Sequence, residues 1–196
     1  MGDTLLAVLG VGVAMAVVVG YAIQNRRAME ARLRQNEIEA RKLGLELVRD
    51  CALQGQFEGF EVMVSPSTKT NSDKVTMTLV RFELVPGLGL GLHVVPRTFI
   101  GGDLFRWATD SKDLPTGDKD FDKAFVVHAK ERGALLEVLG SRARQLMLDF
   151  KARQAEVKLT DERLEVIFEG NPPLSEMRVR KLLKDVLALA LALTRD

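Results

Sequence analysis

Residues 60–85, FEVMVSPSTKTNSDKVTMTLVRFELV, decide the fold class. In the first part, apolar side chains such as Phe60 and Val62 alternate with other residues, which is the period of a strand with one buried face. The polar run 65–73 separates this part from residues 75–85, which are dense in β-branched and large apolar side chains. We therefore predict two strands that pair as a hairpin.

The residues after this hairpin predict more strands and two long helices. Extended segments are expected at 88–95 and 124–128, and a charged hairpin at 157–169. Helices over 133–150 and 175–193 carry their apolar residues on one face, as helices that cover a sheet do. The predicted fold class is α+β: a mostly antiparallel sheet covered on one face by two helices, preceded by an N-terminal transmembrane helix and a helical tether.

The transmembrane helix is predicted over residues 4–23. Within it, LLAVLGVGVAMAVVVGYAI has no charged side chain, and as a helix it would cover roughly 28 Å, close to the hydrocarbon thickness of a bilayer. We prefer this prediction to a cleaved signal peptide because no basic residue precedes the apolar run. Arg26 and Arg27 follow it, so the positive-inside rule places residues 1–3 outside and the rest in the cytoplasm, beneath the plasma (inner) membrane.

Two features predict self-association, so a homodimer is one alternative for the assembly. Gly12, Ala16 and Gly20 recur every four residues, and small residues at this spacing let two membrane helices approach closely. The tether, residues 24–53, has apolar residues spaced three and four apart, as in a helix. Such a helix either pairs with a second copy or docks one face on the folded domain, which we place at residues 57–196.

Composition excludes one class of partner. The formal net charge is +1, with 28 Lys and Arg against 27 Asp and Glu, so the chain lacks the basic surface that nucleic acid requires. The one cysteine, Cys51, cannot form a disulfide within the chain and suits a reducing compartment.

Three patterns resemble functional motifs but depart from them. In PGLGLGL the glycines Gly87, Gly89 and Gly91 are spaced by two, whereas a dinucleotide loop needs G-x-G-x-x-G before a helix. The acidic run DKDFD, residues 118–122, lacks the glycine and the final glutamate of a calcium loop. The two histidines, at 93 and 128, fall in predicted strands without neighbouring ligands. We predict no catalytic residue, no cofactor and no metal ligand.

Residues 100–127 form the candidate interaction loop. A connection this long is usually functional or disordered, and this one is rich in large apolar side chains. Phe121 and Phe125 are four apart, as on one helical turn, which Asp118 or Asp122 would cap. The alternative is that the loop only stabilises the fold. The candidate interaction residues are Trp107, Asp118, Phe121, Asp122 and Phe125.

The same segment carries a resemblance. Thr116-Gly117-Asp118-x-x-Phe121-Asp122-x-x-Phe125-x-Val127, followed by a Leu/Arg-rich helix and a charged hairpin, resembles a pattern in bacterial membrane-anchored domains of unknown function. The similarity covers roughly residues 101–170. It implies a shared structural or binding element and brings no activity with it.

These observations predict a membrane-tethered cytoplasmic protein that acts as a non-enzymatic module for binding a protein partner. The alternative is a domain that binds a small molecule or a divalent metal, including a hydrolase, through residues 103–122. A partner search and a ligand screen separate the two, because a ligand that binds only the folded state raises its stability.

Overall fold

The computed structural model describes residues 21–194 except 22, 28–29, 32, 36, 49–51, 71–73, 98–112 and 171–174. Side chains at 67–70 and 74–76 are also outside the description. The predicted residues Gly12, Ala16, Gly20, Trp107 and Cys51 therefore lie outside the described part of the chain.

An eight-stranded antiparallel sheet forms the centre of the domain, in the order β1-β2-β3-β4-β8-β7-β5-β6. The predicted hairpin is confirmed as β3 and β4, with Val62 opposite Phe82 and Val64 opposite Val80 on the buried face. The strands are β1 Leu45–Leu47, β2 Leu53–Phe57, β3 Phe60–Thr70, β4 Lys74–Glu83, β5 His93–Pro96, β6 Phe125–His128, β7 Glu156–Thr160 and β8 Arg163–Glu169.

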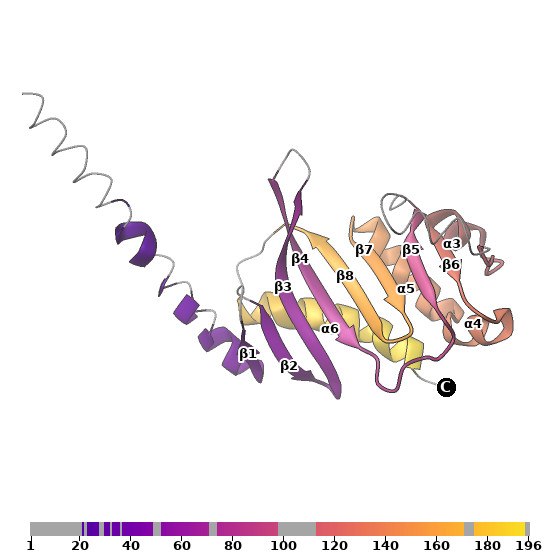
Figure 1. Ribbon diagram of the computed structural model, residues 1–196, viewed down its shortest axis with the longest axis horizontal. Helices are drawn as coiled ribbons and strands as arrows, with labels where there is room; N and C mark the ends of the chain where they lie inside the picture. The colour runs from indigo at the N-terminus through magenta and orange to yellow at the C-terminus, as the bar shows by residue number, and fades with distance from the viewer. Residues whose placement is uncertain are drawn as a thin grey trace, which may run out of the picture.

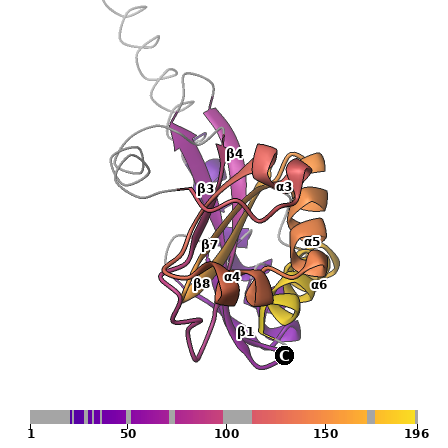
Figure 2. The same cartoon turned by 90° about the vertical axis from the view of Figure 1, so that its right-hand side faces the viewer.

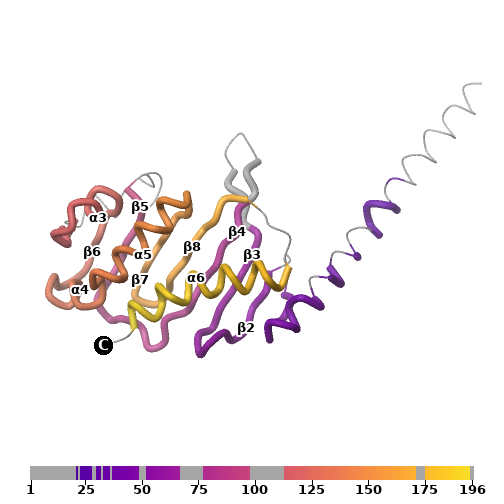
Figure 3. Tube along the Cα trace, turned by 180° about the vertical axis from the view of Figure 1, so that it is seen from behind, coloured from indigo at the N-terminus to yellow at the C-terminus, as the bar shows by residue number. Residues whose placement is uncertain are grey.

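Helices cover one face of this sheet (Figure 2). They are α3 Lys119–Ala124, α4 Arg132–Val138, α5 Ser141–Ala152 and α6 Glu176–Thr194. The helix predicted over 133–150 is divided into α4 and α5, because Gly140 adopts an extended ψ of 167° immediately before α5. Seen from behind, α6 runs across β3, β4 and β8 (Figure 3). Its buried residues recur every three or four positions, which is the spacing of one helix face.

The predicted transmembrane helix requires a correction of the fold class. No helix in the ranges that the structure describes is long and apolar enough to cross a membrane. Residues 4–20 and 22 of the predicted span lie outside those ranges. Tyr21 and Ile23 are the first described helical residues of the N-terminal helix, and the described residues that follow, up to Lys42, include ionised side chains such as Arg26 and Glu30, which a bilayer core excludes.

The tether is also shorter than predicted. The N-terminal helix, which projects from the β1 end of the sheet (Figure 1), gives way to β1 at Leu45 instead of continuing to residue 53. Gly44 lies between them with a φ of 71°, a left-handed conformation that commonly ends a helix. The strands β1 and β2 therefore belong to the folded domain, and β2 pairs with β3.

The last turns of the N-terminal helix dock on the domain through Glu39. Its Oε2 accepts a hydrogen bond of 2.9 Å from the backbone N–H of Glu176, the first residue of α6. This amide, followed by the Lys42 ammonium, holds the pKa of Glu39 below its ordinary value despite the opposing effect of burial. Ala40 and Leu43 are buried in the core. A carboxylate from the tether thus lies at the N-terminus of α6. The first backbone N–H groups of a helix have no partner within it and carry a partial positive charge, so they favour an anion there.

Candidate functional site

The candidate interaction residues of the α3 region make contacts within the fold. Asp118 caps α3, with its side chain accepting from the N–H groups of Asp120 and Phe121. Phe121 and Phe125 are 0% and 1% exposed, and their rings stack with centroids 4.9 Å apart. The structure therefore shows why the spacing in this motif suits a folded turn: one side chain caps it and two rings anchor it in the core.

Asp122 closes the loop that precedes α3. Its Oδ1 accepts from both the N–H and the hydroxyl of Thr116, at 2.9 and 2.7 Å, and its Oδ2 accepts from the N–H of Gly117. Burial raises the pKa of this carboxyl, but the bonds from Thr116 and Gly117, with the nearby Arg144 guanidinium, hold it below its ordinary value of 3.8. Hydrogen bonds to the charged form have this effect, so Asp122 stabilises the loop as a carboxylate.

The lowered pKa of Asp122 predicts a pH dependence of stability. The pKa of Asp122 is lower in the folded protein than in the unfolded chain, where it is near 3.8. The contribution of Asp122 to the stability of the fold is therefore complete above pH 3.8 and is lost as the pH falls through the lower folded pKa. Asp122→Asn should therefore melt below the wild type at about pH 6, with the difference shrinking towards about pH 3. Thermal melts followed by circular dichroism measure this difference. Asp120→Asn, on the exposed side of the same helix, is the control, and a difference for Asp122→Asn that stays constant with pH would contradict the prediction.

The backbone of the glycine-rich segment binds a carboxylate of the same chain, that of Asp161. The N–H groups of Leu90, Gly91 and Leu92 all donate to the carboxylate of Asp161, at 2.7–3.0 Å. Asp161 lies in the turn between β7 and β8, and its backbone carbonyl also accepts from Leu88. Successive amides of this kind form a concave anion site, and here the bound anion is an aspartate. The segment thus fastens the β4–β5 loop to the β7–β8 turn.

The two histidines, predicted to be structural, meet in the sheet. His93 on β5 is paired in register with His128 on β6, and His128 is 3% exposed. Burial lowers the pKa of His93, Asp161 opposes this effect, and His128 adds to it. Within the described ranges, no group of three or more His, Cys, Asp or Glu side chains is arranged to hold a metal ion. Residues 103–112 of the alternative metal-binding loop lie outside those ranges.

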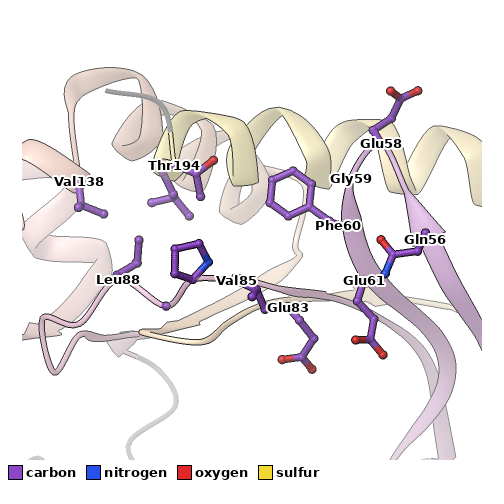
Figure 4. A pocket seen from close by; sticks show the side chains of 13 residues that line it. Gln56, Glu58, Gly59, Phe60, Glu61, Glu83, Val85, Leu88, Val138 and Thr194 are labelled. Atoms are coloured by element: carbon purple, nitrogen blue, oxygen red, sulfur yellow. The ribbon is translucent and has the colours of Figure 1, made fainter.

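A groove opens at the C-terminal end of α6, with a volume of about 860 Å³. It lies between the β2–β3 turn, the β4–β5 loop, the end of α4 and the last residues of α6, and we call it the α6 groove (Figure 4). Sequence analysis missed this site because its walls come from four separate segments. Its apolar lining residues are Phe60, Val85, Pro86, Leu88, Val138 and Leu193.

Apolar and acidic side chains around the α6 groove point in different directions. Leu88, Val138 and Phe60 lie on the side of the strands that the helices cover, whereas Glu61 and Glu83 point to the other side (Figure 4). Val85 is 86% exposed, the most exposed large apolar residue that the structure describes. The segment Val85-Pro86-Gly87, which the sequence marks as a strand breaker, is the one local signal that could have indicated an exposed turn here.

Acidic side chains dominate the charged lining of the α6 groove. Glu58, Glu61 and Glu83 line it, and among the residues that the structure describes no lysine or arginine belongs to the lining. Glu61 accepts from the amide of Gln54 at 3.0 Å, and Arg163 reaches Glu83 at 3.2 Å from outside the lining. Glu58 and Gly59 form the two-residue turn between β2 and β3, with φ values of 50° and 90°.

Comparisons with known proteins inform the fold. No family model matches the chain, and no curated protein matches it. Among solved structures, the chain is similar to the crystal structure of the mycobacterial trehalose monomycolate transport factor A, TtfA, with a TM-score of 0.50 and 11% sequence identity. The alignment covers 83% of this chain and 94% of that one. At this identity, the similarity shows that the two chains share a fold.

Proposed function

We propose that this chain is a non-enzymatic module that works beside a membrane and binds a protein partner through the α6 groove. The observation that carries this proposal is the set of apolar side chains that line the groove, in which Val85 is 86% exposed and Phe60 and Leu88 are partly buried. Elsewhere, the apolar side chains of the described strands and helices mostly form one buried core. A concave surface on which exposed apolar side chains lie among polar ones is typical of a binding site.

The lining suits a macromolecular partner. Burying apolar surface is favourable by about 25 cal/mol for each Å² removed from water, so covering Val85, Pro86 and Leu88 would supply the non-directional part of the binding free energy. The groove is open to solvent, which leaves room for a side chain that projects from a larger surface.

The membrane part of the proposal is supported by the sequence. Arg26 and Arg27 are basic side chains that anionic lipid headgroups attract, which favours a domain held at the cytoplasmic face of the plasma membrane. The neighbour in fold is named as a transport factor, and we propose that this chain likewise assists a transport process by binding a partner. A homodimer is one assembly that would present two such grooves.

Capture from native membranes tests this function. Full-length tagged protein is first recovered in the membrane fraction, then solubilised gently, and the proteins that accompany it are identified by mass spectrometry. We expect a partner that is retained by the wild type and lost from Val85→Asp, because a carboxylate would interrupt the apolar lining. The exposure of Val85 predicts an unchanged melting temperature, which circular dichroism verifies.

Met177→Asp is the matched control for this experiment. Met177 is an apolar side chain of comparable exposure, 81%, and it lies in the first turn of α6, at the opposite end of the helix from the groove. A partner that persists with Val85→Asp, or that both variants lose, would contradict docking at the groove. The absence of any reproducible partner of the wild type would contradict the function as a whole.

A further inference from the structure

We propose that Glu39 acts as a latch that fixes the direction in which the N-terminal helix leaves the folded domain. The Glu39 latch consists of this carboxylate and the three groups that donate to it: Gln35, Lys42 and the backbone N–H of Glu176. It joins two helices whose contacting residues are 137 positions apart in the sequence. The proposal concerns how the domain is held, so it goes beyond the proposed function and does not depend on what occupies the α6 groove.

The described part of the N-terminal helix meets the domain at its last turn. From Tyr21 to Ile38, every described residue is exposed except Leu33, which is half-buried. Glu39 and Ala40 are then 8% and 0% exposed. Figure 3 shows the end of this helix beside the start of α6. The direction of the helix therefore depends on the contacts of a few residues at one end.

Gly44 gives this end of the helix a pivot. Its φ is 71°, and a Cβ at this position would meet nothing within 4 Å, so the backbone turns in open space. The strand β1 begins at the next residue, Leu45, and is held in the sheet by β2. A helix that pivots at one point keeps one direction only when a second point is tied. Glu39 lies five residues before the pivot, about 8 Å along a helix, and its bond to α6 ties that second point.

The bond to α6 adds what the apolar contacts cannot supply. Ala40 and Leu43 pack into the core, but the burial of apolar surface is non-directional. A hydrogen bond requires a particular distance and angle between donor and acceptor. Of these contacts, the one made by Glu39 is therefore the one that specifies an orientation.

Gln35 and Lys42 orient the Glu39 carboxylate. Both donate to Oε1, at 2.6 and 3.1 Å, which leaves Oε2 to accept from the N–H of Glu176 at 2.9 Å. Gln35 lies four residues before Glu39 and Lys42 three residues after it, so all three share one helix face. The Glu39 side chain is 11% exposed, and the bond from Glu176 is the main reason that its pKa stays below the ordinary value. Glu39 is therefore charged at neutral pH.

The start of α6 is suited to receive this carboxylate. The first N–H groups of a helix have no acceptor within it, and the N–H of Glu176 has Glu39 as its acceptor instead. The side chain of Glu176 is paired with Arg180 at 2.9 Å along the same helix. The partial positive charge of a helix N-terminus also favours an anion. The amide and the helix end thus both favour Glu39 at this position.

The helix α6 connects the Glu39 latch to the α6 groove. It begins at Glu176 in the latch, and its last residues, Leu193 and Thr194, line the groove. Its 19 residues cover about 28 Å. Because α6 packs on β4 and α5 between these ends, it is held as a rigid part of the domain. The latch therefore also fixes the direction of the groove relative to the N-terminal helix.

Distance measurements by pulsed electron paramagnetic resonance test the latch on the full-length protein in a non-ionic detergent. The native Cys51 is replaced by serine, so that only introduced cysteines carry spin labels. The first pair of labels, at Arg34→Cys and Lys184→Cys, joins the N-terminal helix to α6, and both positions are exposed. The second pair, at Lys119→Cys and Lys184→Cys, lies within the domain. With Glu39 intact, we expect a narrow distance distribution for both pairs.

Replacing Glu39 with alanine should release the helix and leave the domain intact. Arg34 is ten residues from Gly44 and Glu39 is five, so a displacement at Glu39 is magnified about twofold at the label. We therefore expect the distribution of the first pair to broaden at least about twofold and that of the second pair to stay unchanged. Glu37→Ala is the matched control, because Glu37 is an exposed carboxylate of the same helix that pairs with Arg41 at 2.7 Å.

Two further variants separate the reach of the side chain from its charge. Glu39→Asp keeps the charge but is shorter by one methylene group, so it should broaden the first distribution as alanine does. Glu39→Gln keeps the length and one acceptor oxygen, so it should broaden the distribution less. This order is expected for a specific hydrogen bond and not for a general attraction between charges.

Three results would overturn the latch. The first is a distribution for Glu39→Ala as narrow as that with Glu39 intact, and the second is a broad distribution with Glu39 intact. The third is equal broadening of both label pairs in Glu39→Ala, since the substitution would then loosen the fold of the domain instead of releasing the N-terminal helix.

Discussion

Replacing Phe121 with alanine will destabilise the domain by about 3–5 kcal/mol, the usual range for a fully buried phenylalanine. The ring is 0% exposed and stacks on Phe125 with centroids 4.9 Å apart. It projects from α3, a helix of six residues that packs against α5 and β6. Because α3 is too short to be stable alone, we expect the loss of this anchor to loosen the turn as well as to leave a cavity.

Equilibrium unfolding in urea measures this effect as a shift of the midpoint. Phe121→Leu should lose about 1–1.5 kcal/mol, since it keeps most of the buried volume. Lys123→Ala, an exposed position on the same helix, should change the stability by less than about 0.5 kcal/mol. A loss below about 1 kcal/mol for Phe121→Ala would show that α3 contributes little to the folded state.

Replacing Asp161 with alanine will destabilise the domain by about 2–3 kcal/mol, because three backbone N–H groups lose a charged acceptor. These amides belong to Leu90, Gly91 and Leu92 in the β4–β5 loop, and water would replace only part of the lost bonding. The expected result includes a second effect at a distance. The same loop contributes Val85 and Leu88 to the α6 groove, so its loosening should also weaken binding there.

A series of variants separates the effect of the Asp161 carboxylate on stability from the effect of other changes in the same turn. Asp161→Asn keeps one acceptor oxygen and should lose about half as much stability as the alanine variant. Glu162→Ala, an exposed neighbour in the same turn, should remain within about 0.5 kcal/mol of the wild type. Urea midpoints for the three variants test this order. A stability for Asp161→Ala equal to that of Glu162→Ala would mean that the amides are satisfied without the carboxylate.

The comparison of predicted and observed elements shows where the local spacing of apolar residues is sufficient to predict a strand or a helix. The alternation of residues 60–64 and 163–169 predicted strands, and both segments form strands of the sheet. The prediction over 24–53 was wrong from residue 45 onwards, because Leu43 and Leu47 fit the three-and-four spacing of a helix although Leu47 lies in a strand. Gly44 between them was the missed stop signal.

In the candidate site, too, contacts between residues close in the sequence could be predicted, whereas contacts between distant residues could not. The capping and ring spacing of Asp118, Phe121 and Phe125 could be anticipated, since these residues interact within one or two turns. The anion held by the glycine-rich segment could not, because Asp161 is about 70 residues away in the sequence. The spacing of the glycines departs from that of a dinucleotide loop, but it carried no information about which anion the amides would bind.

The sequence alone determined the features that depend on neighbours along the chain: the strand alternation around Val62, the apolar face of α6 and the helical turn that carries Phe121. The tertiary structure decided which distant segments meet. It placed Glu39 on the first amide of α6, 137 residues away, and it brought the β2–β3 turn, the β4–β5 loop and the end of α6 together around one groove. The physical reason is that periodicity reports which face of an element is buried, whereas the order of strands in the sheet determines what that face and its ends contact.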